Sequence, residues 1–354
     1  MKGKKQRIEY IDAMRGFTMV LVVLSHVLMY TFSSTPTFSF NDVFLTFRMP
    51  LFFFLSGFLM YRNGRFDKIV DTGGFMKQKF IVQLIPTFIF SFLYALIAHL
   101  SYKGLWLDKA KGGYWFTYTL FFFFLIYSVG DYLLGKVFHG KLKLLIGSGI
   151  AILIYFFSKY SLTPGCPWSQ SWINGFLGLA NFQYFLFFFF GALVKSHLNR
   201  FFEIIDNPIG MMGILVSFIA LLLVLLVPSI SEPLTRFSIA AYSVLKTITG
   251  FFGITIVFAF FRKYQDSFKK DKVLGRGLQY IGERTLDIYL LQVFFVYANL
   301  QGVGAFFTAH CNPILELFAG LLVSLAIIIV CLVLSNMIRC SNTLAKLLFG
   351  KVIE

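Results

Sequence analysis

Long uninterrupted apolar stretches recur along the whole chain, and short polar segments that carry most of the charge separate them. A helix needs about 20 apolar residues to cross a bilayer core. The stretches do not alternate with period two, which indicates helices and not the strands of a barrel. We therefore expect an all-α integral membrane protein, a bundle of about ten transmembrane helices. The predicted spans are residues 13–33, 42–61, 80–100, 114–133, 142–158, 172–194, 210–228, 237–261, 283–300 and 314–338.

The basic residues are distributed unevenly among the segments that connect these spans. If the N-terminus is cytoplasmic, the segments on that side hold 24 Lys and Arg residues and the outward segments hold five, with alternation at every loop. Cytoplasmic loops carry an excess of Lys and Arg, so this distribution predicts that both termini are cytoplasmic. The first stretch is too long for a signal peptide and lacks a small-x-small cleavage site. Without a repeat or a soluble appendage, residues 1–354 are expected to form a single transmembrane domain.

Composition agrees with this interpretation. Hydrophobic residues make up 58% of the chain and charged residues 14%, whereas soluble globular proteins carry roughly 25% charge. The formal net charge of +16 would suggest a nucleic-acid partner for a soluble protein. In a membrane protein the same charge is expected to lie against the anionic cytoplasmic leaflet. The composition thus predicts membrane lipids as partners and no nucleic acid.

The four cysteines leave two interpretations open. Cys166 and Cys311 both fall in predicted outward loops, where a disulfide or two separate thiols are equally compatible with the sequence. Cys331 and Cys340 lie in or just below the last span and are expected to be packing residues.

Ionisable residues inside a membrane are costly, so each of them is a candidate for a functional role. In the first span, Arg15 and His26 are eleven residues apart, which is close to three helical turns, so both lie on one face roughly 16 Å apart along the axis. Asp12 is placed to form an ion pair with Arg15, and Tyr30 continues the same face beyond His26. One helix is thus expected to present a charge near the cytoplasmic surface and an imidazole in its outer half.

Three other charged residues lie in predicted spans near or beyond the depth of the bilayer centre. Arg48 enters the second span from its outer end, Glu316 lies near the outer end of the tenth span, and Lys246 lies nearer the middle of the eighth. They are compatible with a polar pocket open to the outside. They are equally compatible with a structural Arg48–Glu316 ion pair, or with side chains that reach the outer headgroups.

Arg62 and Arg65 follow the second span on the cytoplasmic side. Two guanidinium groups three residues apart suit a phosphate-bearing ligand, although ordinary cytoplasmic basic residues produce the same pattern. The sequence has no Walker loop, no GxSxG, no HExxH and no Cys/His cluster with zinc spacing. It therefore gives no support for ATP-driven pumping, soluble-type serine hydrolysis or metal chemistry.

Four motifs occur in order along nearly the whole chain: Arg7-Ile-Glu-Tyr-Ile-Asp12-Ala-Met-Arg15-Gly16 with His26, Arg48-Met-Pro-Leu-Phe-Phe-Phe-Leu-Ser56-Gly57, Arg62-Asn-Gly-Arg65, and Gly282-Glu-Arg-Thr285-Leu-Asp-Ile-Tyr289-Leu-Leu-Gln292. Together they resemble the membrane acyltransferase-3 family of O-acyltransferases. The chain departs from that family at two positions: residues 48 and 292 are often His there, so His26 is the only well-placed imidazole here.

The resemblance implies transfer of an acyl group, commonly acetyl, from cytoplasmic acyl-CoA to a hydroxyl of a sugar or glycan. His26 would then act as general base, or as a transient acyl carrier. Arg15 would orient or charge-stabilise the donor, and Arg48 would steer the acceptor or stabilise developing negative charge. Arg62 and Arg65 would bind the CoA phosphates. A bacterial inner membrane is the location that the resemblance suggests.

A secondary transporter or a flippase for a lipid-linked sugar is the alternative, because such proteins also need charges inside the membrane. Their folds often show repeats and matching broken helices, and neither is visible here. A glycan polymerase or ligase usually carries a large outward loop, and the longest one predicted here, residues 159–171, is small.

Overall fold

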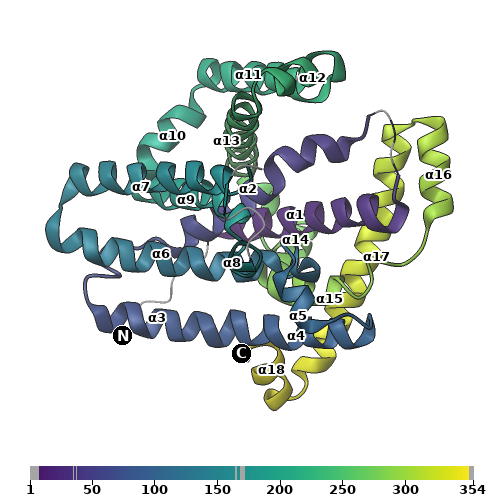
Figure 1. Cartoon of the computed structure of the whole chain (residues 1–354), viewed down its shortest axis with the longest axis horizontal. Coiled ribbons are helices and arrows are strands. Elements are labelled where there is room, and N and C mark those ends of the chain that lie inside the picture. The colour runs from purple at the N-terminus through teal and green to yellow at the C-terminus, as the bar shows by residue number, and fades with distance from the viewer. Residues whose placement is uncertain (1–7, 35, 37, 164–165, 168–171, 351–354) are drawn as a thin grey trace. The chain divides into compact units, whose positions relative to one another are not determined.

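The computed structural model describes residues 8–34, 36, 38–163, 166–167 and 172–350 (Figure 1), and these residues form helices and turns with no strand among them. They group into two compact units, which we describe separately. Unit 1 comprises Met1–Leu55, His197–Ile288 and Phe295–Leu332, and unit 2 comprises Ser56–Ser196, Tyr289–Phe294 and Val333–Glu354. Some basic residues that entered the topology prediction lie outside the described residues: Lys2, Lys4, Lys5, Arg7 and Lys351.

Unit 1 is built on the first span and the later helices that pack against it. Glycines permit the closest of these contacts: a Cβ on Gly16 would collide with the backbone carbonyl of Leu278, and a Cβ on Gly282 with that of Asp12. Small residues at such positions let helix backbones approach in a membrane protein. The helices are α1 (Glu9–His26), η1 (Val27–Phe32), α2 (Phe40–Met60), α10 (Leu198–Asp206), α11 (Pro208–Leu226), α12 (Pro228–Phe237), α13 (Ile239–Lys263), η5 (Gln265–Phe268), α14 (Val273–Glu283), α15 (Thr285–Gln292), α16 (Gln301–His310) and α17 (Pro313–Arg339). The C-terminal parts of α2, α15 and α17 belong to unit 2.

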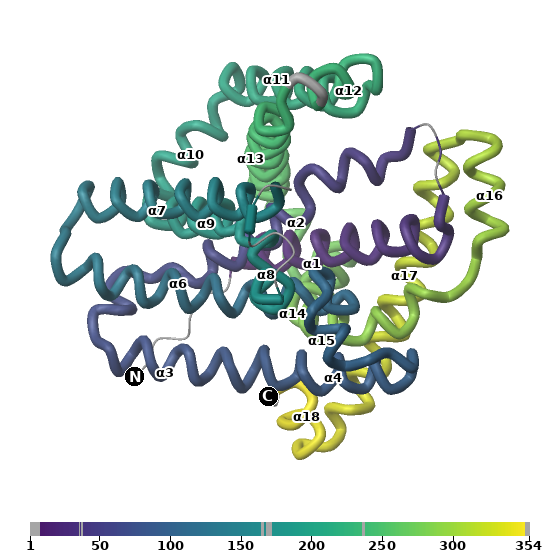
Figure 2. Tube along the Cα trace, viewed as in Figure 1, coloured from purple at the N-terminus to yellow at the C-terminus, as the bar shows by residue number. Residues whose placement is uncertain are grey.

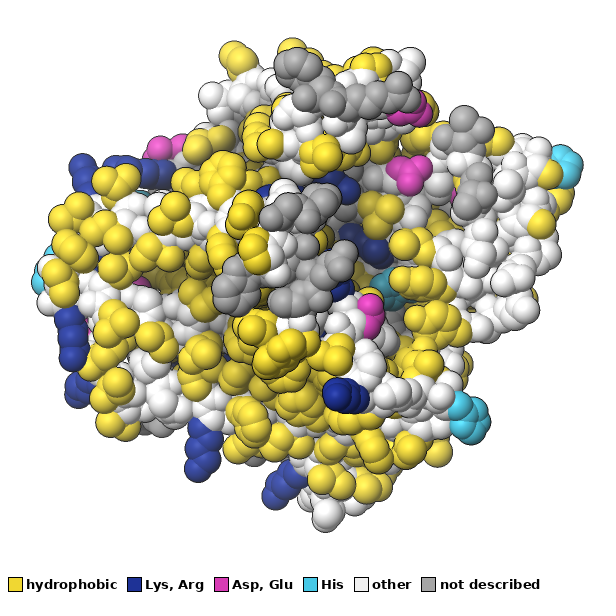
Figure 3. Space-filling model, viewed as in Figure 1, with side chains coloured by type: hydrophobic (Ala, Val, Ile, Leu, Met, Phe, Trp, Pro, Cys, Tyr) yellow, Lys and Arg dark blue, Asp and Glu magenta, His cyan; other side chains and the backbone are white. Residues whose placement is uncertain are grey.

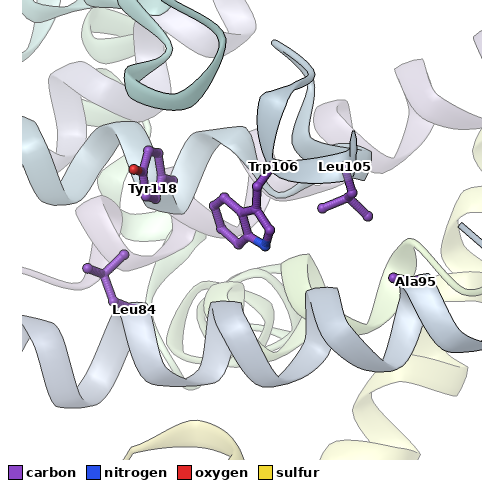
Figure 4. Close-up of a cluster of buried hydrophobic side chains, with 5 residues drawn as sticks. All are labelled: Leu84, Ala95, Leu105, Trp106 and Tyr118. Carbon is purple, nitrogen blue, oxygen red and sulfur yellow. The ribbon is translucent and has the colours of Figure 1, made fainter. Parts of the chain in front are cut away.

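Unit 2 has an aromatic-rich interior. The Trp106 ring lies 4.8 Å from the Phe88 ring and 5.1 Å from the Tyr118 ring, within a buried cluster that Figure 4 shows. In Figure 2, α3, η2 and α4 form one continuous rod. The helices of unit 2 are α3 (Ile69–Lys79), η2 (Phe80–Leu84), α4 (Ile85–Ile97), α5 (Tyr102–Leu107), η3 (Lys111–Gly113), α6 (Trp115–Val137), α7 (Gly140–Tyr160), α8 (Trp172–Leu177), η4 (Leu179–Tyr184), α9 (Phe185–Ser196) and α18 (Asn342–Phe349).

Among the described residues, nine helical segments are long and apolar enough to cross a membrane. Eight of the ten predicted spans correspond to long helices, and the sixth corresponds to the composite segment Leu179–Ser196. Large apolar side chains are exposed on many of these helices, for example Leu145 and Leu153 on α7, and hydrophobic side chains are widespread on the face in Figure 3. Such a surface is expected where lipid, and not water, surrounds the protein. The all-α membrane architecture is therefore confirmed.

The ninth predicted span, residues 283–300, is not one long helix. α14 ends at Glu283, α15 covers eight residues, and residues 293–300 are not helical. Eight residues give only about 12 Å of helix, too little to cross a bilayer. Non-helical backbone at membrane depth is tolerated only where it is buried in protein or lines a water-filled cavity. Val293 and Val296 are buried, whereas residues 297–300 are exposed, so protein covers only the first part of this segment. Apolar composition alone did not reveal this break.

Candidate functional site

Polar side chains lie along α1 in unit 1, beginning with Arg15. Its Nη1 lies 3.2 Å from Asp12 Oδ1, so the predicted ion pair is confirmed. Its Nη2 donates a hydrogen bond of 3.1 Å to Thr285 Oγ1, at the start of α15. The close packing of α1 on α14 at Gly16 and Gly282 brings these two distant parts of the chain together. The guanidinium is thereby fixed in direction while part of it remains exposed.

His26 lies at the point where the first span changes its helical geometry. α1 ends at His26, and the next six residues form a π-helix. Short π-helical segments are rare and are frequent at functional sites. The half-buried imidazole lies 5.8 Å from the Tyr30 ring, and that ring lies 5.3 Å from the Tyr297 ring. The one imidazole in this span thus faces an aromatic, partly accessible surrounding.

Neighbouring segments of unit 1 hold the π-helix in place. Thr31 Oγ1 donates to the Val296 carbonyl at 2.6 Å, and the Leu300 amide donates to the Thr31 carbonyl at 3.0 Å. A Cβ on Gly304 of α16 would collide with the Phe32 carbonyl, so α16 lies directly against the same turn. These contacts use the non-helical residues that replace the ninth predicted span, which gives that break a structural role.

Arg48 of α2 lies against the same helix. Its side chain is 7% exposed, and Nη1 donates to the Val22 carbonyl at 3.4 Å, one helical turn before His26. Glu316 of α17 is 2% exposed, and its Oε1 accepts a hydrogen bond of 2.6 Å from Ser34 Oγ. Because Arg48 and Glu316 are both buried, the interpretation that they reach the outer headgroups is wrong. Lys246 has an exposed side chain on α13.

The structure therefore arranges the predicted residues of unit 1 as a column and not as one tight cluster. Arg15 is near one end, Arg48 reaches the helix at Val22, and His26 is one turn farther on. Since Arg15 and His26 are roughly 16 Å apart along the helix, they cannot act on the same reacting atom of one small group. Thr285 was part of a motif in the sequence, but only the fold shows that it contacts Arg15.

Arg62 and Arg65 both belong to unit 2. Arg62 is exposed, whereas Arg65 is half-buried, donates from Nη1 to the Met60 carbonyl at 2.9 Å, and places its guanidinium 4.3 Å from the centre of the Phe75 ring. Burial, and then the neighbouring charge of Arg62, lowers the pKa of Arg65. A bound anion would relieve both effects, because it compensates for lost hydration and for the repulsion between the cations.

Lys79 is a cation of this region that the sequence did not single out. Its Nζ lies 4.2 Å from the centre of the Phe124 ring and 5.5 Å from that of Phe75, so Lys79 and Arg65 lie against the same Phe75 ring. A second π-helix, η2, begins directly after Lys79, as η1 begins directly after His26. The local sequence does not predict this π-helix, so the position of Lys79 beside Phe75 could be recognised only from the fold.

Lys111 is a second cation that the sequence left as an ordinary loop charge. Its side chain is 0% exposed, and Nζ donates to the carbonyls of Gly175, Trp106 and Asp108 at 2.7, 3.0 and 3.4 Å. These three acceptors match the three donors of an ammonium group. Burial lowers the pKa of Lys111 to about 8, and the nearby Asp108 opposes this effect. The arrangement connects the loop before α6 to α5 and α8.

Cysteine chemistry adds nothing to this site. Cys166 is buried in unit 2 and Cys311 is exposed in unit 1, and each is a free thiol in the structure. Among the described residues, no group of three or more His, Cys, Asp and Glu side chains is arranged to hold a metal ion.

Comparison with known proteins gives one match. The model of a family of acyltransferase domains, acyltransferase-3, matches residues 8–333. No curated protein and no solved structure matches the chain.

Proposed function

The chain belongs to the acyltransferase-3 family and is a membrane acyltransferase, and we propose that it moves an acetyl group from cytoplasmic acyl-CoA to a hydroxyl of a cell-surface sugar or glycan. The observation that carries this proposal is the polar column along α1. It runs from Arg15, through the buried Arg48, to His26 at the start of the π-helix. We further propose that the protein resides in a bacterial inner membrane with both termini cytoplasmic. This topology requires the broken segment of residues 283–300 to complete one crossing beside the nine long helical segments.

In the proposed reaction, His26 is the general base. Its imidazole takes the proton of the acceptor hydroxyl while that oxygen attacks the thioester carbonyl. The C–S bond then breaks, and the departing CoA thiolate takes the proton back from the imidazolium, so no net proton is gained or lost. A covalent route, in which His26 carries the acyl group between two steps, is the less favoured variant of this proposal.

The arginines of unit 1 have separate tasks in this proposal. Arg48 stabilises the negative charge that develops on the carbonyl oxygen, or steers the acceptor. Its burial supports this role, because a fixed charge acts most strongly where water is excluded. Arg15 orients or charge-stabilises the donor, and the two hydrogen bonds that fix its guanidinium support such a positioning role.

Arg62 and Arg65 are proposed to bind the phosphates of acyl-CoA. The lowered pKa of Arg65 and its position on Phe75 beside Lys79 support an anion at this place. A planar guanidinium that stacks on an aromatic ring keeps its edge available for a phosphate oxygen.

The proposal is tested by CoA release from acetyl-CoA. Purified protein in nanodiscs is mixed with acetyl-CoA, with and without a membrane glycolipid extract as acceptor. We expect release that depends on the extract, and radioactive acetyl label in the glycolipid fraction. Folded protein that releases no CoA with any of several extracts would contradict the proposal and favour transport of a lipid-linked sugar.

A further inference from the structure

Glu316 has a buried carboxylate oxygen that the protein leaves unused. The side chain is 2% exposed, and Oε1 accepts a hydrogen bond from Ser34, but Oε2 has no hydrogen-bond partner among the described residues. Buried polar atoms nearly always have partners, because an unmatched one costs its full desolvation energy. A carboxylate oxygen left in this state is ready to accept a hydrogen bond from a ligand.

The position of Glu316 relates it to the column along α1. It lies in the first turn of α17, and Gly320, one turn farther on, packs against Leu24 and Leu28 on either side of His26 in the sequence. Residues four apart lie on the same face of a helix, so Glu316 is on the face of α17 that packs against α1 and η1. Its partner Ser34 lies two residues after the end of η1 and eight residues after His26.

A second carboxylate lies close enough to interact with Glu316. Asp42, in the first turn of α2, interacts electrostatically with Glu316. Its Oδ2 accepts a hydrogen bond of 3.3 Å from the Ser39 backbone amide. The buried Asn41 next to it has a side-chain oxygen, Oδ1, that also lacks a partner among the described residues. The carboxylates of Glu316 and Asp42 and the side-chain oxygen of Asn41 are all hydrogen-bond acceptors. A ligand that binds at this end of the column must therefore supply hydrogen-bond donors.

We propose that Glu316 binds a hydroxyl group of the acceptor, with Oε2 accepting its hydrogen bond. Hydrogen bonds from hydroxyls to carboxylates are short and strong, and sugars supply several such donors. The buried charge of Arg48 on the same helix column disfavours a cationic ligand, which leaves a neutral, hydroxyl-rich one. This inference rests on the proposed function, because it assigns the acceptor side of the same reaction.

The test compares Glu316→Gln with a matched control, Glu232→Gln, which changes an exposed carboxylate of α12. Glutamine keeps the size of the side chain and an oxygen for Ser34, but it replaces the second acceptor by a donor. Three quantities are measured: the KM for acetyl-CoA, the concentration of glycolipid extract that gives half-maximal CoA release, and the Tm with and without extract. Ser34→Ala is a second variant, which removes the partner of Oε1 and leaves Oε2 in place.

We expect Glu316→Gln to raise the half-maximal extract concentration at least tenfold, with the KM for acetyl-CoA within twofold of wild type. The Tm without extract should not fall, because an unmatched buried charge is removed, and Ser34→Ala should change the extract dependence less than Glu316→Gln does. An unchanged extract dependence in Glu316→Gln overturns the inference. A lower Tm with both kinetic constants unchanged also overturns it, because Glu316 is then only structural.

The failure of the proposed function gives a different result. If wild type releases no CoA, but extract raises the Tm of wild type and of Glu232→Gln and not of Glu316→Gln, then the binding role of Glu316 stands and acyl transfer to this acceptor does not. If extract neither stimulates CoA release nor raises the Tm of wild type, both the function and the role of Glu316 are contradicted.

Discussion

The Arg15 guanidinium donates a hydrogen bond of 3.1 Å to Thr285 Oγ1, a residue 270 positions later in the chain. The same guanidinium pairs with Asp12 on its own helix. Gly16 and Gly282 make the contact possible, because any side chain on either would collide with the facing backbone. The first and last of the four sequence motifs are thus parts of one structural arrangement, in which a charged group near the end of α1 is held in a fixed direction.

We predict that Thr285→Val lowers kcat/KM for acetyl-CoA about tenfold, because Arg15 loses one of the two bonds that orient it. A hydrogen bond to a charged group contributes about 1.5–3 kcal/mol, and partial exposure of Arg15 places the effect at the lower end. Thr285→Ser keeps the hydroxyl and should restore activity to within twofold of wild type. Steady-state CoA release measures kcat/KM of both variants. An equal loss of kcat/KM in Thr285→Val and Thr285→Ser would show that packing at this position, and not the hydrogen bond to Arg15, supports activity.

Two glycines of α14 should respond to alanine in opposite directions. At Gly282 the new methyl group meets the Asp12 carbonyl, so the helices must separate, and we expect a loss of about 1–3 kcal/mol in the free energy of unfolding. At Gly277 nothing lies within 4 Å, so alanine should stabilise the helix by up to about 1 kcal/mol. The Tm of Gly282→Ala should therefore fall while that of Gly277→Ala stays or rises. Similar changes at both positions would contradict the close packing.

The cations around Phe75 should act on the donor and not on the acceptor. We predict that Arg65→Gln and Lys79→Gln each raise the KM for acetyl-CoA about tenfold, because each removes a charge beside Phe75 that would bind the donor phosphates in the proposed function. Lys77→Gln, which changes an exposed lysine of α3, is the matched control and should stay within twofold. The half-maximal extract concentration should remain unchanged in all three variants. An unchanged KM for acetyl-CoA in Arg65→Gln and Lys79→Gln would remove this region from donor binding.

Lys111 should make stability depend on pH in alkaline solution. Its pKa is about 8 in the folded protein and 10.5 as its ordinary value, so below pH 8 it is charged in both the folded and the unfolded state. Between these values the unfolded chain binds more protons, and the free energy of unfolding therefore rises with pH, by about 3 kcal/mol at most. Lys111→Met should lack this rise. Denaturation of both proteins from pH 7 to 10.5 measures the difference, and parallel pH profiles would contradict the assignment.

Much of the fold could be predicted because a helix that crosses a membrane requires a long apolar stretch in the sequence. Apolar length located the long helices, and helical periodicity placed Asp12 beside Arg15. The break within residues 283–300 was not predictable in this way, because its composition remains apolar although the helix ends at Gln292. Apolar length alone does not distinguish a continuous helix from an interrupted one.

The candidate site was predictable only as far as its charges are unusual inside a membrane. Arg15, His26 and Arg48 stood out for that reason. Thr285, Lys79 and Lys111 did not, because a hydroxyl or a loop lysine is ordinary in sequence, and only contacts with distant segments give these residues their significance. The glycines after Lys111, Gly112 and Gly113, were the one local signal, since both adopt positive φ in the turn that buries it.

The central claim is that the imidazole of His26 serves as base in acyl transfer. The most direct measurement is acceptor-dependent CoA release from acetyl-CoA by purified wild type and by His26→Ala, with equal folding verified by Tm. A general base contributes about 100-fold to 10,000-fold, so we predict a loss of at least 100-fold in the variant, with the KM for acetyl-CoA little changed. Release at the wild-type rate by folded His26→Ala protein would contradict the account.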